Sequence, residues 1–148
     1  MLGTSDEMRK PEWPTWIVKP EELPFEPLDP PPDDVIRVAA ACREPEGLNA
    51  TIDIVDMSHC RYIVIVDIDS KSREVSYIEN IRNLFSQMPR RVALRLAYWL
   101  VKSGVNIVIS CGYCHNMTYY LDQSGVTRLI ATAGERVLDV LRRFGLVR

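Results

Sequence analysis

Short runs of apolar and β-branched residues recur along the chain after residue 34, and each run has the length of a β-strand. The most continuous run, 62–68, has the composition of a strand buried on both faces, so we expect it at the centre of the sheet. A polar turn at 69–72 follows and favours a hairpin with residues 74–78. The remaining predicted strands cover residues 35–41, 51–55, 105–110 and 126–131, and the 51–55 signal is weak.

Between the later strands the apolar period changes to that of a helix. Pro89 suits the first turn of a helix in which Val92, Leu96 and Leu100 recur at every fourth position, and Gly104 ends it. The pattern predicts two more helices, over residues 114–124 and, after a capping-box spacing of Thr132 and Glu135, over the last residues of the chain. Alternating strands and helices imply parallel crossovers, so we predict an α/β fold with a mixed sheet and helices on its faces.

Residues 1–33 differ from the rest. They contain most of the ten prolines and two of the three tryptophans. Proline fixes φ and removes backbone donors, so we interpret this acidic segment as an N-terminal tail and residues 34–148 as the domain. Trp13, Trp16, Leu23 and Phe25 suggest an alternative in which the tail lies on the domain in extended form. The domain itself is slightly basic.

The composition indicates the compartment. Hydrophobic residues make up 47% and charged residues 26% of the chain, which is ordinary for a globular protein. No run approaches the roughly 18 apolar residues of a spanning helix, and the first residues lack a signal-peptide pattern, so we expect a cytoplasmic protein without membrane or nucleic-acid partners. Cysteines in a reducing compartment are more often thiols or ligands than disulfides.

The segment Cys111-Gly112-Tyr113-Cys114-His115 carries the strongest chemical signal. It places two thiols and an imidazole between a buried strand and a helix. The amino end of a helix favours thiolate over thiol, which predicts a lowered pKa for a cysteine there. Because two residues separate the cysteines, both sulfurs are predicted to reach one metal ion or one cluster edge.

Further candidate ligands lie at other strand ends. Cys42 follows the first predicted strand, and the carboxyl ends of parallel strands meet at one edge, so Cys42 and Cys111 should lie on the same edge. His59 and Cys60 directly precede the strand at 62–68. The predicted metal ligands are therefore Cys111, Cys114, His115, Cys60, His59 and Cys42.

Other interpretations of this segment remain open. Cys-x-x-Cys-His is also the attachment signature of c-type haem, but haem attachment needs an exported protein. Cys-x-x-Cys before a helix is typical of thioredoxin-like oxidoreductases. These enzymes normally have a cis-proline that faces the thiols, and this chain has no proline after Pro89. The cysteines could equally be buried residues without a chemical role. Asp67 and Asp69 are interpreted as turn residues rather than catalytic acids.

Several segments together resemble the dinitrogenase iron-molybdenum cofactor biosynthesis family over nearly the whole domain. The resemblance implies a ribonuclease H-like, three-layer α/β/α fold with a five-stranded mixed sheet. The segments that carry it are 35–41, 62–69, 77–80, 97–109, 121–126 and 134–137.

The resemblance also implies a function. Members are small, usually non-enzymatic proteins that bind or carry iron-sulfur or iron-molybdenum clusters. They commonly have a His-Phe-Gly segment ahead of the strand that begins here at Tyr62; this chain has Asp56-Met57-Ser58 there, and His59 is the available substitute. The family's glycine-rich turn is replaced by the segment from Cys111 to His115, which favours thiolate ligands.

The leading hypothesis is therefore a non-enzymatic cytoplasmic carrier of an iron-sulfur or iron-molybdenum cluster, with zinc as an alternative metal. Its expected partners are cluster-assembly or acceptor proteins, and its expected state is a monomer or weak homodimer. Two alternatives stay open: a metal-free protein-interaction module, and a dithiol oxidoreductase that uses Cys111 and Cys114.

Overall fold

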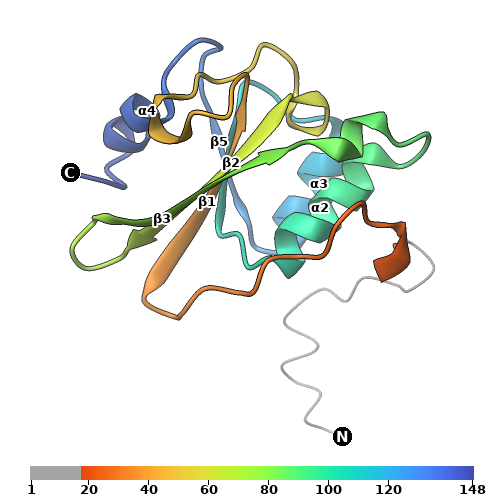
Figure 1. The fold of residues 1–148 in the computed structure, drawn as a ribbon, viewed down its shortest axis with the longest axis horizontal. Coiled ribbons are helices and arrows are strands. Elements are labelled where there is room, and N and C mark those ends of the chain that lie inside the picture. The colour runs from red at the N-terminus through yellow and green to blue at the C-terminus, as the bar shows by residue number, and fades with distance from the viewer. Residues whose placement is uncertain (1–17) are drawn as a thin grey trace, which may run out of the picture.

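The computed structural model describes residues 18–148 as one mixed sheet flanked by helices (Figure 1). The strand order is β3-β2-β1-β4-β5. The pairs β3–β2 and β2–β1 are antiparallel, whereas β1–β4 and β4–β5 are parallel, as the hairpin and the helical crossovers predict. The strands are β1 Val35–Cys42, β2 Tyr62–Asp69, β3 Val75–Arg82, β4 Ile107–Ser110 and β5 Thr127–Ile130.

Helices cover both faces of this sheet, so the predicted ribonuclease H-like three-layer architecture is confirmed. α2 (Val92–Lys102) and α3 (His115–Gln123) lie on one face and α4 (Val137–Arg143) on the other. Each face has its own apolar cluster. The α2/α3-side cluster includes Ile63, Ile65, Phe85 and Trp99, and the α4-side cluster includes Val64, Val66, Ile109 and Leu141. Short 3-10 turns occupy Pro20–Glu22, Gly47–Asn49, Met57–His59 and Leu84–Gln87.

The central strand is β1, not β2, so the prediction that residues 62–68 form the centre is wrong. β1 pairs with β2 on one side and with β4 on the other, and its residues from Val38 to Cys42 are fully buried. β2 is equally buried, which explains the error: the apolar clusters cover both of its faces although it is not the central strand.

Several other boundaries differ from the prediction. The weak strand expected at 51–55 is reduced to two isolated bridge residues, Thr51 and Ile52. β3 continues to Arg82, well beyond the predicted end of the hairpin strand. α2 begins at Val92, because Arg91 adopts a left-handed conformation with φ of 58° as its N-cap, so Pro89 lies ahead of the helix rather than in its first turn.

Arg37 connects β1 to three other segments. Its guanidinium forms a bidentate ion pair with Asp67 in β2, at 2.8 and 2.9 Å, and both side chains are buried. The same guanidinium donates to the carbonyl oxygens of Asp29 and Ser103, each at 2.7 Å. Asp67 is thus the buried partner of an arginine and not a turn residue, whereas Asp69 does accept the backbone N–H groups of the turn that follows it.

The described part of the predicted tail, residues 18–33, packs on the domain; we call it the strap. Phe25 makes edge-on ring contacts with Phe85 at 5.4 Å and with Trp99 at 5.5 Å. The Trp99 indole N–H donates to the Glu26 carbonyl at 3.0 Å. Leu23 and Leu28 also pack on the α2/α3-side cluster. The contacts expected for Leu23 and Phe25 are therefore present, while Trp13 and Trp16 lie outside the described residues.

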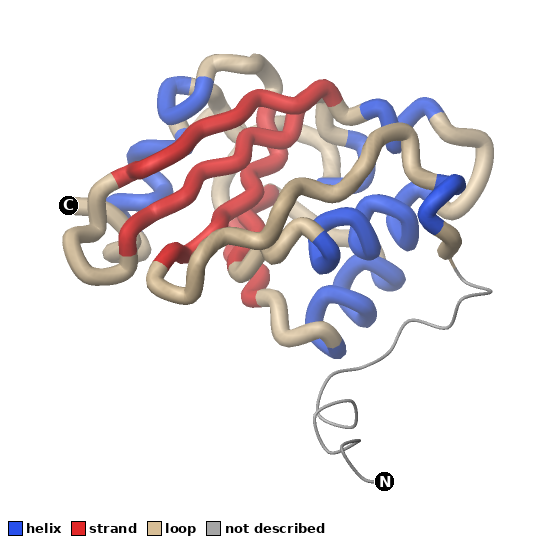
Figure 2. The backbone as a smooth tube through the Cα atoms, turned by 60° about the horizontal axis from the view of Figure 1, so that its bottom comes forward, coloured by secondary structure: helices blue, strands red, loops and turns tan. Residues whose placement is uncertain are grey.

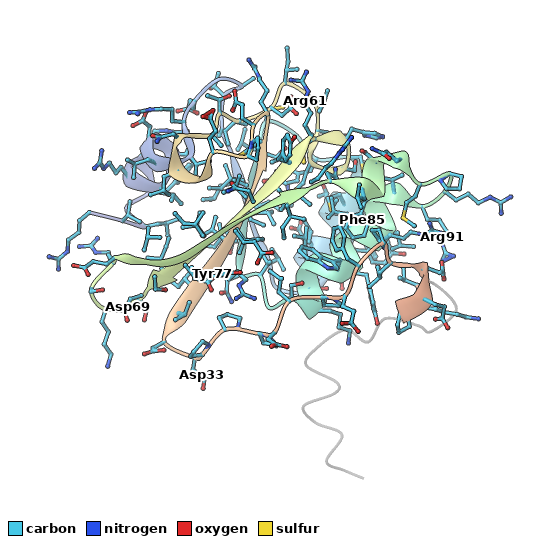
Figure 3. All side chains as sticks on the ribbon, in the orientation of Figure 1. Asp33, Arg61, Asp69, Tyr77, Phe85 and Arg91 are labelled. Atoms are coloured by element: carbon cyan, nitrogen blue, oxygen red, sulfur yellow. The ribbon has the colours of Figure 1, made fainter. Side chains whose placement is uncertain are left out.

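Charge complementarity adds to the contacts of the strap. The carboxylate of Glu22 lies 3.4 Å from the Arg91 guanidinium and 3.5 Å from that of Arg95, at the start of α2 (Figure 3). The acidic segment thus meets a basic part of the domain at one defined place. The strap belongs structurally to the fold it covers.

We expect Asp67→Asn to lower the free energy of unfolding by about 3–5 kcal/mol, because it leaves the buried Arg37 charge without its partner. Urea denaturation followed by circular dichroism measures this change. Asp122→Asn is the matched control, since Asp122 makes a similar bidentate pair with Arg128 at the surface and should cost less than about 1 kcal/mol. Equal losses in the two variants would contradict this interpretation of the Arg37–Asp67 pair.

Candidate functional site

The carboxyl ends of β1 and β4 lie at the same edge of the sheet, as predicted. The parallel register pairs Val38 with Ile107 and Ala40 with Ile109, so both strands finish side by side. Cys42 ends β1, and Cys111 follows the end of β4. We call the segment 110–114 the cysteine turn.

A second segment, the 53–60 loop, lies against the cysteine turn. The backbone N–H of Met57 donates to the Gly112 carbonyl at 3.1 Å. The Cys111 thiol donates to the Val55 carbonyl, with 3.3 Å between sulfur and oxygen. The sequence around His59 and the sequence around Cys111 are thus brought together at one edge, although about fifty residues separate them.

Tyr113 holds the cysteine turn between β4 and β5. Its hydroxyl lies 2.7 Å from the Leu129 carbonyl and 3.1 Å from the Val108 carbonyl. The Arg128 guanidinium lies over its ring, 5.3 Å from the centroid. Because burial raises the pKa of Tyr113, the phenol keeps its proton and remains a donor. The turn is therefore held in place by hydrogen bonds from the Tyr113 side chain to the backbones of β4 and β5.

The two cysteines of the turn pack on different faces of the sheet. Cys111 packs on the α4-side cluster, and Cys114, the N-cap of α3, packs on the α2/α3-side cluster. The chain bends at Cys111 and lies outside any helix or strand from Gly112 to Cys114, so the two cysteines do not share the face of a helix. The predicted sharing of one ion by both sulfurs is not the arrangement that the described residues show.

The pKa predicted for Cys111 is wrong in direction. Burial of the thiol, together with the negative charges of Asp53 and Asp56, raises its pKa above the ordinary value. Cys111 lies three residues before the N-cap of α3, outside the first turn, where the helix dipole has little effect. Its thiol is also a hydrogen-bond donor, which requires the protonated form.

Cys42 and Cys60 are core residues of this structure. Both are fully buried, Cys42 in the α4-side cluster and Cys60 in the α2/α3-side cluster. Burial raises the pKa of both thiols, and that of Cys60 reaches about 12 despite the nearby Asn83 amide. As ligands they would first have to reach the surface and lose a proton.

The two histidines are exposed. His59 Nδ1 lies 2.8 Å from an oxygen of Asp56, whose carboxylate also accepts the backbone N–H of His59. A carboxylate on one ring nitrogen orients a histidine and leaves the other nitrogen free to bind, as in many metal sites. His115 is the first residue of α3. Asp56 and Tyr113 are the site residues that sequence reasoning missed; the only signal was the capping spacing between Asp56 and His59.

Residues 18–148 contain no group of three or more His, Cys, Asp and Glu side chains that could hold a metal ion. The edge does present single ligands at its surface: partly exposed Cys111 and exposed His59 around the 53–60 loop, and partly exposed Cys114 and exposed His115 at the start of α3. Such scattered side chains suit a metal group whose metals are already coordinated mostly by non-protein atoms. They do not suit a bare metal ion, which needs several protein ligands close together.

Comparison with known proteins places the chain in a family. The family model described as dinitrogenase iron-molybdenum cofactor matches residues 51–146. The chain belongs to this family. The matched segment includes the 53–60 loop, the cysteine turn and every strand except β1. Among curated proteins, none matches the chain.

Solved structures share the fold of this family member. The apo form of the orange protein from Desulfovibrio gigas is 19% identical, with a TM-score of 0.61 and coverage of 73% of this chain and 85% of that one. The protein PH0822 is 23% identical, with a TM-score of 0.59 and coverage of 74% and 89%. A putative NifB protein from Thermotoga is 20% identical, with a TM-score of 0.57 and coverage of 74% and 86%. In the described part of the chain, every helix is too short or too polar to cross a membrane.

We expect stability to fall above pH 9 because Cys60 is protonated in the folded state. Its pKa rises from 9.0 to about 12 on burial, so the unfolded chain releases this proton first and alkaline pH favours unfolding. The free energy of unfolding should fall by up to about 1.4 kcal/mol per pH unit for this thiol, between the two pKa values. Urea titrations at a series of pH values measure the slope.

Cys60→Ala should make that slope shallower. Ile63→Val is the matched control, because it also removes apolar volume from the α2/α3-side cluster but no titrating group. If the slope is the same in the wild type and in Cys60→Ala, the Cys60 thiol does not cause the alkaline loss.

We expect Cys111 to react slowly with iodoacetamide at mildly alkaline pH, mainly because burial raises the pKa of its thiol, and Asp56→Asn to increase the rate slightly. Removing a negative charge near the sulfur lowers the pKa of Cys111 and so raises its thiolate fraction. Peptide mass spectrometry separates Cys111 from Cys114. Asp122→Asn, which removes an acidic residue of α3 instead, should have no effect; an unchanged rate in Asp56→Asn would refute the electrostatic assignment.

Proposed function

We propose that this protein is a non-enzymatic carrier that binds a preformed iron-sulfur or iron-molybdenum type cluster at the edge formed by the 53–60 loop and the cysteine turn. The contact between these two segments carries the proposal, because it brings Cys111 and His59 to one edge of the sheet. Membership of a family named for the iron-molybdenum cofactor supports a cluster as the cargo.

The small number of ligands favours a cluster over a bare metal ion. A structural zinc site needs four protein ligands, and the described residues offer no group of even three. The iron ions of a cluster are already bridged by sulfide, so each needs fewer ligands from the protein. A carrier must also release its cargo, and few protein ligands make release easier.

A cluster is larger than a single ion, so it can be bound by two cysteines that pack on different faces of the sheet. Ligands that are too far apart to share one ion can each bind a different metal of the same cluster. In this proposal Cys111 is the principal ligand and His59, oriented by Asp56, is the second. Cys114 and His115 meet the cluster from the α3 side, where no described side chain caps the helix and its N–H groups favour an anion. Cluster-assembly or acceptor proteins are the corresponding partners.

The two alternative functions make opposite predictions. A metal-free interaction module is favoured by the missing three-ligand group, and it predicts that no cluster binds. Dithiol exchange is disfavoured by the raised pKa of Cys111 and by the packing of Cys111 and Cys114 on different faces. Because the strap packs on the domain, a test of the role of the N-terminus should remove residues 1–17 and leave the strap in place.

The test is anaerobic reconstitution with iron and sulfide, followed by metal and sulfide analysis and absorption spectroscopy. We expect close to one cluster per chain. Cys111→Ser should abolish most of the loading, and His59→Asn should reduce it, because each removes a candidate ligand that is at least partly exposed at this edge. Cys42→Ala and Cys60→Ala are matched controls that remove buried sulfurs, and the folded fraction of each should load normally.

Two outcomes would contradict the proposal. Failure of the wild type to bind either iron or sulfide would favour the metal-free module. Normal loading of Cys111→Ser together with loss of loading in Cys60→Ala would show that the cluster binds to sulfurs that this structure buries.

A further inference from the structure

β3 forms one margin of the sheet over a length of eight residues. It pairs with β2 on one side, and no strand of the described residues pairs with its other side (Figure 2). The opposite margin, β5, has only four residues. A long strand with one unpaired side is a template for pairing with another chain.

The hydrogen bonds identify which backbone groups of β3 face outward. The N–H of Asn83 donates to the Arg61 carbonyl at 3.0 Å, just past the end of β3, in the register that pairs Arg82 with Tyr62. In an antiparallel pair the residues alternate between facing the partner strand and facing away. The N–H and C=O groups of Ile78, Asn80 and Arg82 therefore point away from β2.

Exposed apolar side chains lie at the same margin. Tyr77 and Ile78 are 44% and 38% exposed. Figure 3 labels Tyr77 on this strand. Consecutive residues of a strand point to opposite faces, so a partner lying on one face of the sheet would cover only one of them. A strand added along the edge would flank both.

We propose that a second copy of this chain adds its β3 to this edge, in antiparallel orientation, about a two-fold axis at Asn80. Ile78 of one copy then lies opposite Arg82 of the other, and Glu79 opposite Ile81, so no like charges face each other directly. A two-fold interface uses the same surface on both subunits. Each outward N–H of one β3 therefore donates to an outward C=O of the other β3, and the reverse.

The β-bulge in β3 limits the length of this pairing. The register between β2 and β3 shifts at Asp67 and Ile68, where β3 carries one extra residue. A bulge twists a strand and ends regular pairing. The contact between copies is thus confined to the segment from Tyr77 to Arg82, which makes the dimer weak and dependent on concentration.

The test compares Arg82→Pro with Arg82→Ala. The Arg82 side chain is exposed and makes no hydrogen bond or ion pair to any residue from 18 to 148. Proline is tolerated where the N–H of an edge strand faces solvent, so both variants should fold, and only the proline removes the outward donor. Sedimentation velocity over a range of protein concentrations should show a dimer for the wild type and for Arg82→Ala.

For Arg82→Pro we expect association to weaken by about tenfold or more, because each copy loses one hydrogen bond and gains a ring at the interface. Amide hydrogen exchange gives the register. Protection of Ile78, Asn80 and Arg82 should rise with protein concentration, while Tyr77, Glu79 and Ile81 are protected at every concentration.

Three results would overturn the proposal. The first is a wild type that stays monomeric at all concentrations. The second is equal association of the proline and alanine variants. The third is protection of Ile78, Asn80 and Arg82 that does not change with concentration, which would mean that another segment of the same chain covers this edge.

Discussion

The fold depends on the side chain of Arg37 at the start of β1. Its guanidinium binds Asp67 in β2, the end of α2 through the Ser103 carbonyl, and the strap through the Asp29 carbonyl. The backbone of the same residue exchanges two hydrogen bonds with Asn106, just before β4. One residue thus aligns both strands that pair with β1. A buried guanidinium needs several acceptors, which obliges these segments to meet.

Through the register of the strands, this alignment also positions the edge of the sheet that holds the candidate site. Once β1 and β4 are set relative to each other at their amino ends, their carboxyl ends must also finish together. The cysteine turn follows one of these ends, and the 53–60 loop is held against it by Met57 and Cys111. A polar interaction at one end of the sheet therefore determines the chemistry available at the other.

The elements could be predicted from the sequence because their periodicity is local. The hairpin of β2 and β3 and the helix α2 follow from apolar spacing and turn residues alone. The identity of the central strand could not be predicted, since β1 and β2 are equally buried and only long-range pairing distinguishes them. The left-handed Arg91 and the pairing of Asp67 with Arg37 also depend on contacts between distant residues.

The location of the candidate site could be predicted from the sequence, but the arrangement of its side chains could not. The carboxyl edge of the parallel strands was correctly expected to hold Cys42 and Cys111. The spacing of two residues between the cysteines predicted that both sulfurs would reach one metal ion or one cluster edge. In the structure the segment between the cysteines belongs to no helix or strand, and Cys111 and Cys114 pack on different faces of the sheet.

The position of β1 has a consequence for the boundary of the unit. The family match begins at residue 51, after β1 has ended, although β1 is the middle strand of the sheet. A polypeptide trimmed to the matched range would leave β2 and β4 each with an open margin and would remove Arg37 as well. The range matched by the family model is therefore smaller than the sheet, and the strand that it leaves out is the one at the centre.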